Sequence, residues 1–461
     1  MDGFWVRKIG KAARPWLVLA PLLLASAAQA QVGGPIGGPV GPVGGPAAGP
    51  ARVAGVPGGG TVAPDRGADD DAAPTGGVVV NAQRGFDVGV SFVSEYGSNL
   101  IRLGDGIALS NGLVSRSDFR FRPAVNVRFG QPLGRQLLFV NGTLGRDFYA
   151  RNTILNKNRY GADAGLAWEL ARCTGRAQGS YTRRQAQFEL DNDVIDNPQE
   201  RSTLLVSGSC PIGARLAPSL SASWNKIRNK APGRDRFDTD TFNLNGALGY
   251  AVTPRLQLGL NGSYTNLRRS NLLVFALPPV GPPVLLGVNT LDFYSATVNA
   301  TYAIGPSLKV NGSVGLNISK EILPPSKQIT DTVYSAGVSY TGPRISASLN
   351  ADRAVQPAPG GEASVYVTDG LSANLGYQLG SSIDLYAGWS HRKREFRGSA
   401  NPQEPLIRRS ERSDRFFVGA STDVGRLFTI GIEGSHVRRR SDPSIYNYST
   451  TNAQISLRAN F

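Results

Sequence analysis

The chain contains two histidines, and a serine precedes each of them. His391 lies in GWSHRKRE and His436 lies in GSHVRRRS. A serine that is activated by a histidine can act as the nucleophile in hydrolysis. Both pairs lie in segments of alternating apolar and polar residues, which predict β-strands, and adjacent side chains of a strand point to opposite faces. Ser390 and Ser435 therefore cannot be activated by the histidines that follow them, and only a pairing across strands stays open.

Other reactive side chains give no pattern of a catalytic, metal or cofactor site. The two cysteines, Cys173 and Cys210, are far from both histidines in the sequence, which is not the spacing of zinc ligands. Glycine pairs of the GxG type lie within strand-like segments and not between a strand and a helix, so they do not predict a phosphate-binding loop. We expect no catalytic residue, no metal, no cofactor and no enzymatic activity.

The alternation around these residues repeats along most of the chain. In 117–129, for example, apolar residues alternate with Arg120, Arg122 and Arg128. Segments of about ten residues with this period of two are typical of transmembrane β-strands. We count eighteen of them, which begin near residues 84, 117, 136, 158, 176, 202, 217, 240, 255, 291, 307, 331, 344, 363, 382, 413, 426 and 447.

The connections between these segments have two kinds of length. Those after even-numbered segments are tight, such as VTPR, IGPS and TGPR, and those after odd-numbered segments are longer and charged, such as LDNDVIDNPQE. Short periplasmic turns and longer outer loops are expected of bacterial outer-membrane barrels. This favours a membrane barrel over a soluble β-sandwich or propeller. Four tyrosines that precede tight turns are expected at the inner membrane–water interface: Tyr250, Tyr302, Tyr340 and Tyr377.

Both ends of the chain agree with export to the outer membrane. Residues 1–30 have the order of a secretory signal peptide: a basic start, an apolar stretch and AQA before the expected cleavage after Ala30. Residues 31–82 are rich in Gly, Pro and Ala and predict a disordered linker in the periplasm, which leaves 83–461 for the barrel. The chain ends in a strand-like alternation that closes on Phe461.

The terminal strand with its final Phe461 resembles the C-terminal signal of Gram-negative outer-membrane β-barrels. In that family the barrel-insertion machinery reads this signal. The whole pattern over about 83–461 resembles the putative β-barrel porins that are often encoded with exopolysaccharide genes. The resemblance implies an outer-membrane channel for passive diffusion, or an accessory barrel in polysaccharide export or surface assembly with a polysaccharide as partner. A surface enzyme or adhesin is a third reading.

The net charge of +15 points to anionic partners. For an exported barrel these are lipopolysaccharide phosphates and anionic solutes and not nucleic acid. Cations at the outer strand ends are expected to contact lipopolysaccharide: Arg183, Arg184, Arg268, Arg269, Arg438, Arg439 and Arg440. Cations that alternate inward are expected to line the pore and attract anionic or polar solutes: Arg120, Arg122, Arg128, Lys309 and Arg458.

Two further features complete the predicted topology. Cys173 lies in the turn that joins the fourth and fifth segments, and Cys210 lies where the sixth segment reaches the same side. Adjacent strands are about 4.8 Å apart, so we expect these cysteines to form a disulfide at the periplasmic rim. The apolar stretch 272–288 on the outer side can enter the pore, cap it or project as a hairpin, and the sequence alone does not choose among these. A buried plug or lid is favoured over an exposed tip, because large exposed apolar patches are uncommon without a partner.

Overall fold

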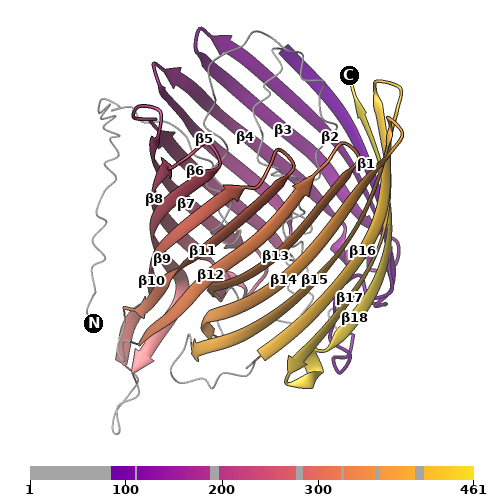
Figure 1. Ribbon diagram of the computed structural model, residues 1–461. Coiled ribbons are helices and arrows are strands. Elements are labelled where there is room, and N and C mark those ends of the chain that lie inside the picture. The colour runs from indigo at the N-terminus through magenta and orange to yellow at the C-terminus, as the bar shows by residue number, and fades with distance from the viewer. Residues whose placement is uncertain are drawn as a thin grey trace, which may run out of the picture.

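The computed structural model describes residues 85–109, 112–186, 197–276, 284–322, 327–358, 363–399 and 410–461. These residues form eighteen antiparallel strands, in which each strand pairs with the next in sequence and β1 also pairs with β18. The strands therefore close into one barrel (Figure 1). This confirms the predicted fold class. The predicted signal peptide 1–30 and linker 31–82 lie outside the described residues.

The strands differ in length, and the longest ones form the β9–β10 hairpin. Their bounds are β1 (Gly85–Gly97), β2 (Asp118–Leu133), β3 (Gln136–Tyr149), β4 (Lys157–Leu170), β5 (Cys173–Gln185), β6 (Pro198–Ser209), β7 (Leu216–Asn229), β8 (Thr239–Ala251), β9 (Leu256–Ala276), β10 (Val284–Ala303), β11 (Leu308–Glu321), β12 (Gln328–Thr341), β13 (Ile345–Pro357), β14 (Ala363–Leu379), β15 (Ile383–Ser399), β16 (Ser410–Val424), β17 (Phe428–Asp442) and β18 (Tyr448–Asn460). Short 3-10 helices follow β3, β7 and β17: η1 (Thr153–Leu155), η2 (Asp235–Phe237) and η3 (Ser444–Tyr446).

The two ends of the barrel differ in their connections. The end that holds the tight turns is here called the short-turn end. The start of β1 and the end of β18 also lie there, and the Val88 N–H donates to the Phe461 carbonyl. The opposite end is called the long-loop end. There the apolar stretch 272–288 continues β9 and β10, which pair as far as Ala276 and Val284 and extend beyond their neighbours (Figure 1). The described backbone thus favours a projecting hairpin, and 277–283 lie outside the described residues.

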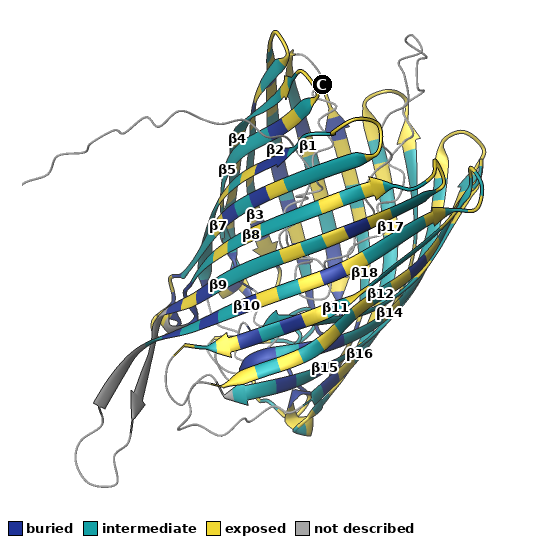
Figure 2. Cartoon of the chain, turned by 60° about the vertical axis from the view of Figure 1, so that its left-hand side comes forward, coloured by how far each residue is buried: buried dark blue, intermediate teal, exposed yellow. Residues whose placement is uncertain are grey.

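The barrel has its apolar side chains on the outside. Large hydrophobic residues in the strand centres are well exposed, such as Leu144 at 59%, Leu204 at 55% and Ile455 at 58%. Exposed and less exposed residues alternate along the strands, as Figure 2 shows. A polar inner face and an apolar outer face are what a membrane-spanning barrel requires. Within the described residues, no helix is long and apolar enough to cross a membrane.

Candidate functional site

The five predicted pore cations all occupy inward-facing positions. Arg128, Lys309 and Arg458 lie near the short-turn end and are exposed. The inward register of β2 follows from its other face, where Phe121 and Val125 are exposed among the outward hydrophobic residues. Arg120 and Arg122 face inward as well, but they are buried at 4% and 8% exposure near the long-loop end. The set therefore divides into exposed and buried cations.

The buried pore cations are neutralised in part by carboxylates. The Glu95 carboxylate accepts from Arg120 at 2.7 Å and from Arg122 at 3.5 Å. Arg120 also donates to the Tyr149 hydroxyl at 3.2 Å, and its guanidinium lies over that ring. Two arginines thus share one carboxylate. Such a cluster holds its side chains in fixed positions and presents less free charge than separate arginines do.

A second cluster of this kind lies at the same end on β15–β17. Glu411 accepts from Arg394 at 2.6 Å and from Arg439, and all three side chains are nearly buried. The Arg394 guanidinium lies 5.5 Å from the centre of the Tyr366 ring, and the Arg439 guanidinium lies 5.7 Å from the centre of the Tyr448 ring. Carboxylates and rings thus hold the arginines of the long-loop end in place.

The inner face of β4–β6 carries a set of half-buried arginines, here the basic wall: Arg159, Arg176, Arg184 and Arg201. Arg159 and Arg184 directly follow the paired Tyr160 and Arg183 at the end of the β4–β5 ladder. Arg201 on β6 lies opposite Thr182, which is on the same face of β5 as Arg184. Sequence reasoning missed this wall. The signal was present in the sequence. Tyr160 faces outward on β4, so the odd-numbered residues of β4 face inward, and Tyr181 faces outward on β5, so the even-numbered residues of β5 face inward.

The opposite part of the inner face, from β7 to β13, is mostly neutral. Many of its side chains are Ser, Thr and Asn, and several of these hydrogen-bond in pairs across neighbouring strands. The Thr265 hydroxyl donates to the Asn243 amide oxygen at 2.8 Å, and the Asn261 amide donates to that of Asn299 at 2.8 Å. Hydroxyl and amide groups can hydrogen-bond a polar solute without attracting a charge of either sign. The described inner face therefore separates a basic wall from a neutral one.

Three of the predicted lipopolysaccharide contacts point the wrong way for that role. Arg184, Arg269 and Arg439 face inward, and Arg269 is buried at 1% exposure. The prediction treated neighbouring arginines as one patch, whereas successive side chains of a strand point to opposite faces. The other four residues lie on the outward face at the long-loop end: Arg183, Arg268, Arg438 and Arg440.

The barrel wall separates between β12 and β13 toward the long-loop end. These strands pair only from Tyr334 to Thr341, with Arg353 as the last partner on β13. Beyond that point β13 continues to pair with β14 alone, up to Pro357 opposite Val365. β14 stays paired with β15 up to Ala363 opposite Ser399. The backbone ladder is therefore open between β12 and β13 alone, and β13 and β14 continue past this opening on the side of β15.

The separated strand ends fold against the inner face of the wall. Val365 lies on the same face of β14 as Leu375, which is exposed on the outside of the barrel at 54%. Yet Val365 has 0% exposure and packs with Leu267, Leu291 and Phe293, which face inward on β9 and β10. The wall thus overlaps itself, with the tip of the β13–β14 hairpin on the inside. We call the described residues of this region, 354–358 and 363–368, the infolded hairpin.

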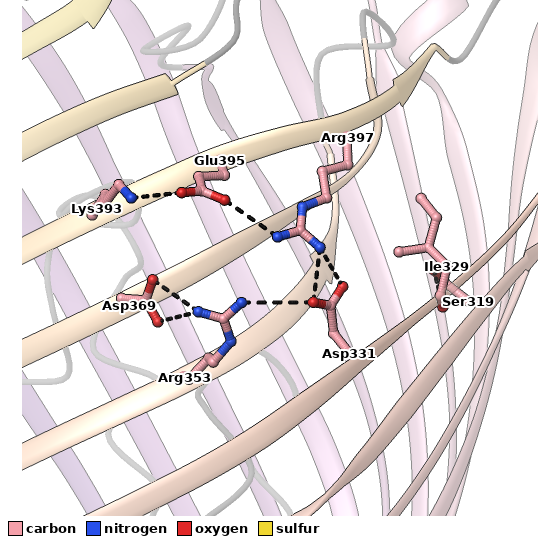
Figure 3. Close-up of polar contacts among 8 residues, drawn as sticks. All are labelled: Ser319, Ile329, Asp331, Arg353, Asp369, Lys393, Glu395 and Arg397. Carbon is pink, nitrogen blue, oxygen red and sulfur yellow. Dashed lines mark hydrogen bonds and ion pairs between the residues drawn. The ribbon is translucent and has the colours of Figure 1, made fainter.

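A network of charges closes the separation (Figure 3). The Asp331 carboxylate on β12 accepts two hydrogen bonds from Arg397 on β15, at 2.8 and 2.9 Å, although two strands intervene. Arg353 reaches Asp331 at 3.6 Å and donates to Asp369 at 2.8 Å. Arg397 also contacts Glu395 at 3.2 Å. Ion pairs and hydrogen bonds thus replace the backbone ladder at this place.

Arg269 anchors the infolded hairpin from the other side. Its guanidinium donates to the backbone carbonyl of Ala358 at 2.6 Å, and more weakly to those of Ala363 and Ser364 at 3.3 and 3.4 Å. It also donates to the Asn289 amide oxygen at 2.6 Å. The hairpin narrows the long-loop end of the lumen, and this buried arginine holds it there.

The histidines are placed as their sequence parity predicts. His391 faces outward, with its Nδ1 atom 2.7 Å from the Asp414 carboxylate, and His436 lies 2.9 Å from the Thr451 hydroxyl. No serine hydroxyl is hydrogen-bonded to either ring within the described residues. No group of three or more His, Cys, Asp or Glu residues that could hold a metal ion occurs in this part of the chain.

A disulfide joins Cys173 and Cys210 at the short-turn end, with a Cα–Cα distance of 4.2 Å. Cys173 begins β5, and Cys210 follows directly after β6. The bond extends the β5–β6 ladder by one position past Thr174 and Ser209. It therefore connects two strands whose loop at the other end is long.

Comparison with known proteins gives a likeness of fold. No protein-family model and no curated protein matches the sequence. The FrpB iron transporter from Neisseria meningitidis (F5-1 variant) has a TM-score of 0.50 and 10% identity, and the match covers 78% of this chain and 63% of that chain. The outer membrane protein OpdK from Pseudomonas aeruginosa has a TM-score of 0.46 and 12% identity, with 82% and 99% covered. At such identities the likeness shows the β-barrel fold alone, and the chain spans less than two thirds of FrpB.

Proposed function

We propose that this chain is an outer-membrane channel for the passive diffusion of small polar solutes, biased toward anions. The observation that carries the proposal is the inner face of a closed eighteen-stranded barrel, which is mostly polar and is basic on β4–β6. Barrels of about sixteen to eighteen strands enclose an aqueous channel. Inward arginines raise the local concentration of anions in such a channel.

The bias is expected to come from the basic wall together with Lys309 and Arg458, because Arg120 and Arg122 share Glu95. Arg128 is expected to add less, because it pairs with Asp87 at 3.7 Å. Reconstituted in planar bilayers, the protein should give discrete conductance steps. In a KCl gradient the reversal potential should have the sign of chloride passing more easily than potassium. Absence of steps would contradict a channel, and preference for potassium would contradict the anion bias.

Matched variants on β5 test the source of the bias. Arg184→Gln removes an inward charge, whereas Arg183→Gln removes an outward charge one residue away. The first variant, combined with Arg159→Gln and Arg201→Gln, should move the reversal potential toward zero. The second should leave it unchanged. Equal effects would mean that the overall charge of the protein, and not the lumen, sets the selectivity.

The remaining expectations about partners belong to the same proposal. Arg438 and Arg440 are exposed on the outward face of β17, and Arg412 on β16 lies directly opposite Arg440. Like charges opposite each other are unfavourable unless an anion lies between them, which supports a contact with lipopolysaccharide phosphates. Passage through the barrel-insertion machinery by way of Phe461 is part of this proposal. The association with exopolysaccharide export stays a prediction of the sequence resemblance.

A further inference from the structure

Six successive hairpins at the short-turn end each carry one cation at the start of their second strand. We call this set the collar: Arg135, Arg172, Arg215, Arg255, Lys309 and Arg344. They belong to the hairpins β2–β3, β4–β5, β6–β7, β8–β9, β10–β11 and β12–β13. All six are exposed. Their repetition at one position of the hairpin brings them to the same rim of the barrel.

The strand register places most of the collar around the mouth of the lumen and not toward lipid. The backbone carbonyls of Arg215, Arg255 and Arg344 accept from the N–H groups of the residues directly opposite on the next strand, Ala251, Ala303 and Gln378. Those opposite positions continue the inward rows of their strands. Arg135 is placed in the same way opposite Glu169. Lys309 lies within β11, opposite Ala303.

The collar differs from the cations of the long-loop end in its lack of counter-charges. No collar residue forms an ion pair with another residue in the described part of the chain. At the long-loop end, by contrast, arginines share Glu95, Glu411 and Asp331. Within the described residues, the inward-facing carboxylates near this rim are Glu169 on a collar strand and Asp87, Asp384 and Asp423 on β1, β15 and β16. Exposed cations without an ion-pair partner among the described residues therefore surround the short-turn mouth, whereas the half-buried basic wall extends toward the other end.

We propose that the collar is a binding site for polyvalent anions at the short-turn mouth. The inference rests on the proposed channel function. It adds where in the barrel the anions bind, which side of the membrane that site faces and which class of anion it takes. Several guanidinium groups around one opening can contact separate charges of the same molecule, and guanidinium groups pair well with phosphate and carboxylate oxygens. A polyvalent anion therefore gains more from the collar than a monovalent one does. In the outer membrane this mouth faces the periplasm, so such anions are concentrated before they leave the cell.

The test measures block of the current by inorganic tripolyphosphate added to either side of a planar bilayer. The orientation of the protein in the bilayer is set through the variant Ser381→Cys in the β14–β15 turn, which is labelled with biotin and held by streptavidin on the short-turn side. The label goes to this cysteine because the native cysteines are bonded to each other. Block from the short-turn side should need about tenfold less tripolyphosphate than block from the long-loop side. Equal block from both sides would overturn the proposal.

Charge-matched variants separate the collar from net charge. Replacing all six collar residues by Gln should abolish the difference between the two sides. Replacing six cations at the long-loop end, Arg183, Lys226, Arg268, Arg412, Arg438 and Arg440, removes the same charge and should preserve the difference. Retention of the difference in the collar variant would also overturn the proposal.

A titration in detergent distinguishes failure of the collar from failure of the channel. A barrel that carries no current contradicts the proposed function. In that case calorimetric titration of tripolyphosphate into the protein in an uncharged detergent still tests the collar. Wild type should bind at least tenfold more tightly than the collar variant. Equal binding by the two proteins would contradict the site itself.

Discussion

Arg268 and Arg269 are adjacent in the sequence and have opposite environments. Arg268 is exposed on the outside of β9, and Arg269 has 1% exposure beneath the infolded hairpin. The pair shows how little a local charge pattern says about the role of a residue in a strand. What decides the role is the parity of its position, which is fixed by the apolar residues on either side.

This pair gives a prediction about the infolded hairpin. Arg269→Gln removes donors from backbone carbonyls at Ala358 and Ala363 that are otherwise out of water. Each unsatisfied buried acceptor costs about 1–3 kcal/mol, so the hairpin should detach more often. Amide hydrogen exchange in 363–368 should then become faster. Arg268→Gln is the control and should leave the exchange unchanged; a similar increase in both variants would show that Arg269 does not anchor the hairpin.

A second pair of neighbours tests which face meets lipid. Leu204 is exposed on the outside of β6 at 55%, and Leu205 faces the lumen. An arginine that faces lipid near the bilayer centre costs about 2–4 kcal/mol, and an arginine that faces water does not. Urea unfolding in lipid vesicles should therefore show a much larger loss of stability for Leu204→Arg than for Leu205→Arg. The reverse order would mean that β6 has been assigned the wrong register.

At the scale of the elements, the β5–β6 hairpin is the one whose ends are covalently joined. The Cys173–Cys210 disulfide closes a separation of 37 residues. On chain-entropy grounds a loop of this size is stabilised by about 4 kcal/mol. The double variant Cys173→Ser/Cys210→Ser should lose about this much free energy of unfolding in urea. Wild type under reducing conditions should match the variant, and an unchanged free energy in both would mean that the hairpin is held by its ladder alone.

The strands were predictable from the sequence because every second residue faces lipid and must be apolar, which gives the period of two. The predicted starts of the eighteen segments lie close to the observed ones, and β10 differs most, beginning at Val284 and not near 291. The difference arises because the apolar stretch extends the β9–β10 hairpin. Five pore cations were placed inward by the same period, as in Arg128 opposite the β3 residue Asn141.

The infolded hairpin could not be predicted in this way. The alternation of β14 continues without a break from Leu375 to Val365, so it gives the same outward face to both. Val365 is buried inside the barrel because it contacts Leu291 and Phe293, which are about seventy residues away in the sequence. The ion pairs of Asp331 hold the strands in this overlap. A local period cannot report such contacts. The basic wall, by contrast, was predictable from the parity of Tyr160 and was overlooked.

At the scale of the whole molecule, the two ends of the lumen differ in their charge and in what occupies them. The short-turn end carries exposed cations, and the long-loop end is narrowed by the infolded hairpin. In the proposed channel, a solute that moves from the short-turn end to the long-loop end would meet the charge before it meets the hairpin. We therefore expect variants of the collar to change charge selection and variants of the hairpin to change the size limit, each without affecting the other.

Truncation of the infolded hairpin tests the size limit. Replacing residues 355–367 by two glycines joins β13 to β14 where Ala354 pairs with Thr368. The single-channel conductance should rise, because the tip no longer occupies the long-loop end, while the preference for chloride should persist. As a control, Glu321→Cys/Ser364→Cys cross-links the tip to the wall where these side chains hydrogen-bond. The locked protein should conduct like wild type, and an unchanged conductance after truncation would show that the hairpin does not limit the channel.

The separation between β12 and β13 also bears on how the barrel can deform. Continuous backbone pairing fixes the circumference of a barrel through its strand number and stagger. Around the short-turn end this pairing is complete, so that half behaves as a closed hoop. Around the long-loop end the hoop is cut between Tyr334 and Gln328, and side chains hold the overlapping edges. That half is a split ring: its diameter can change by sliding one edge over the other, without the loss of a single strand-to-strand hydrogen bond.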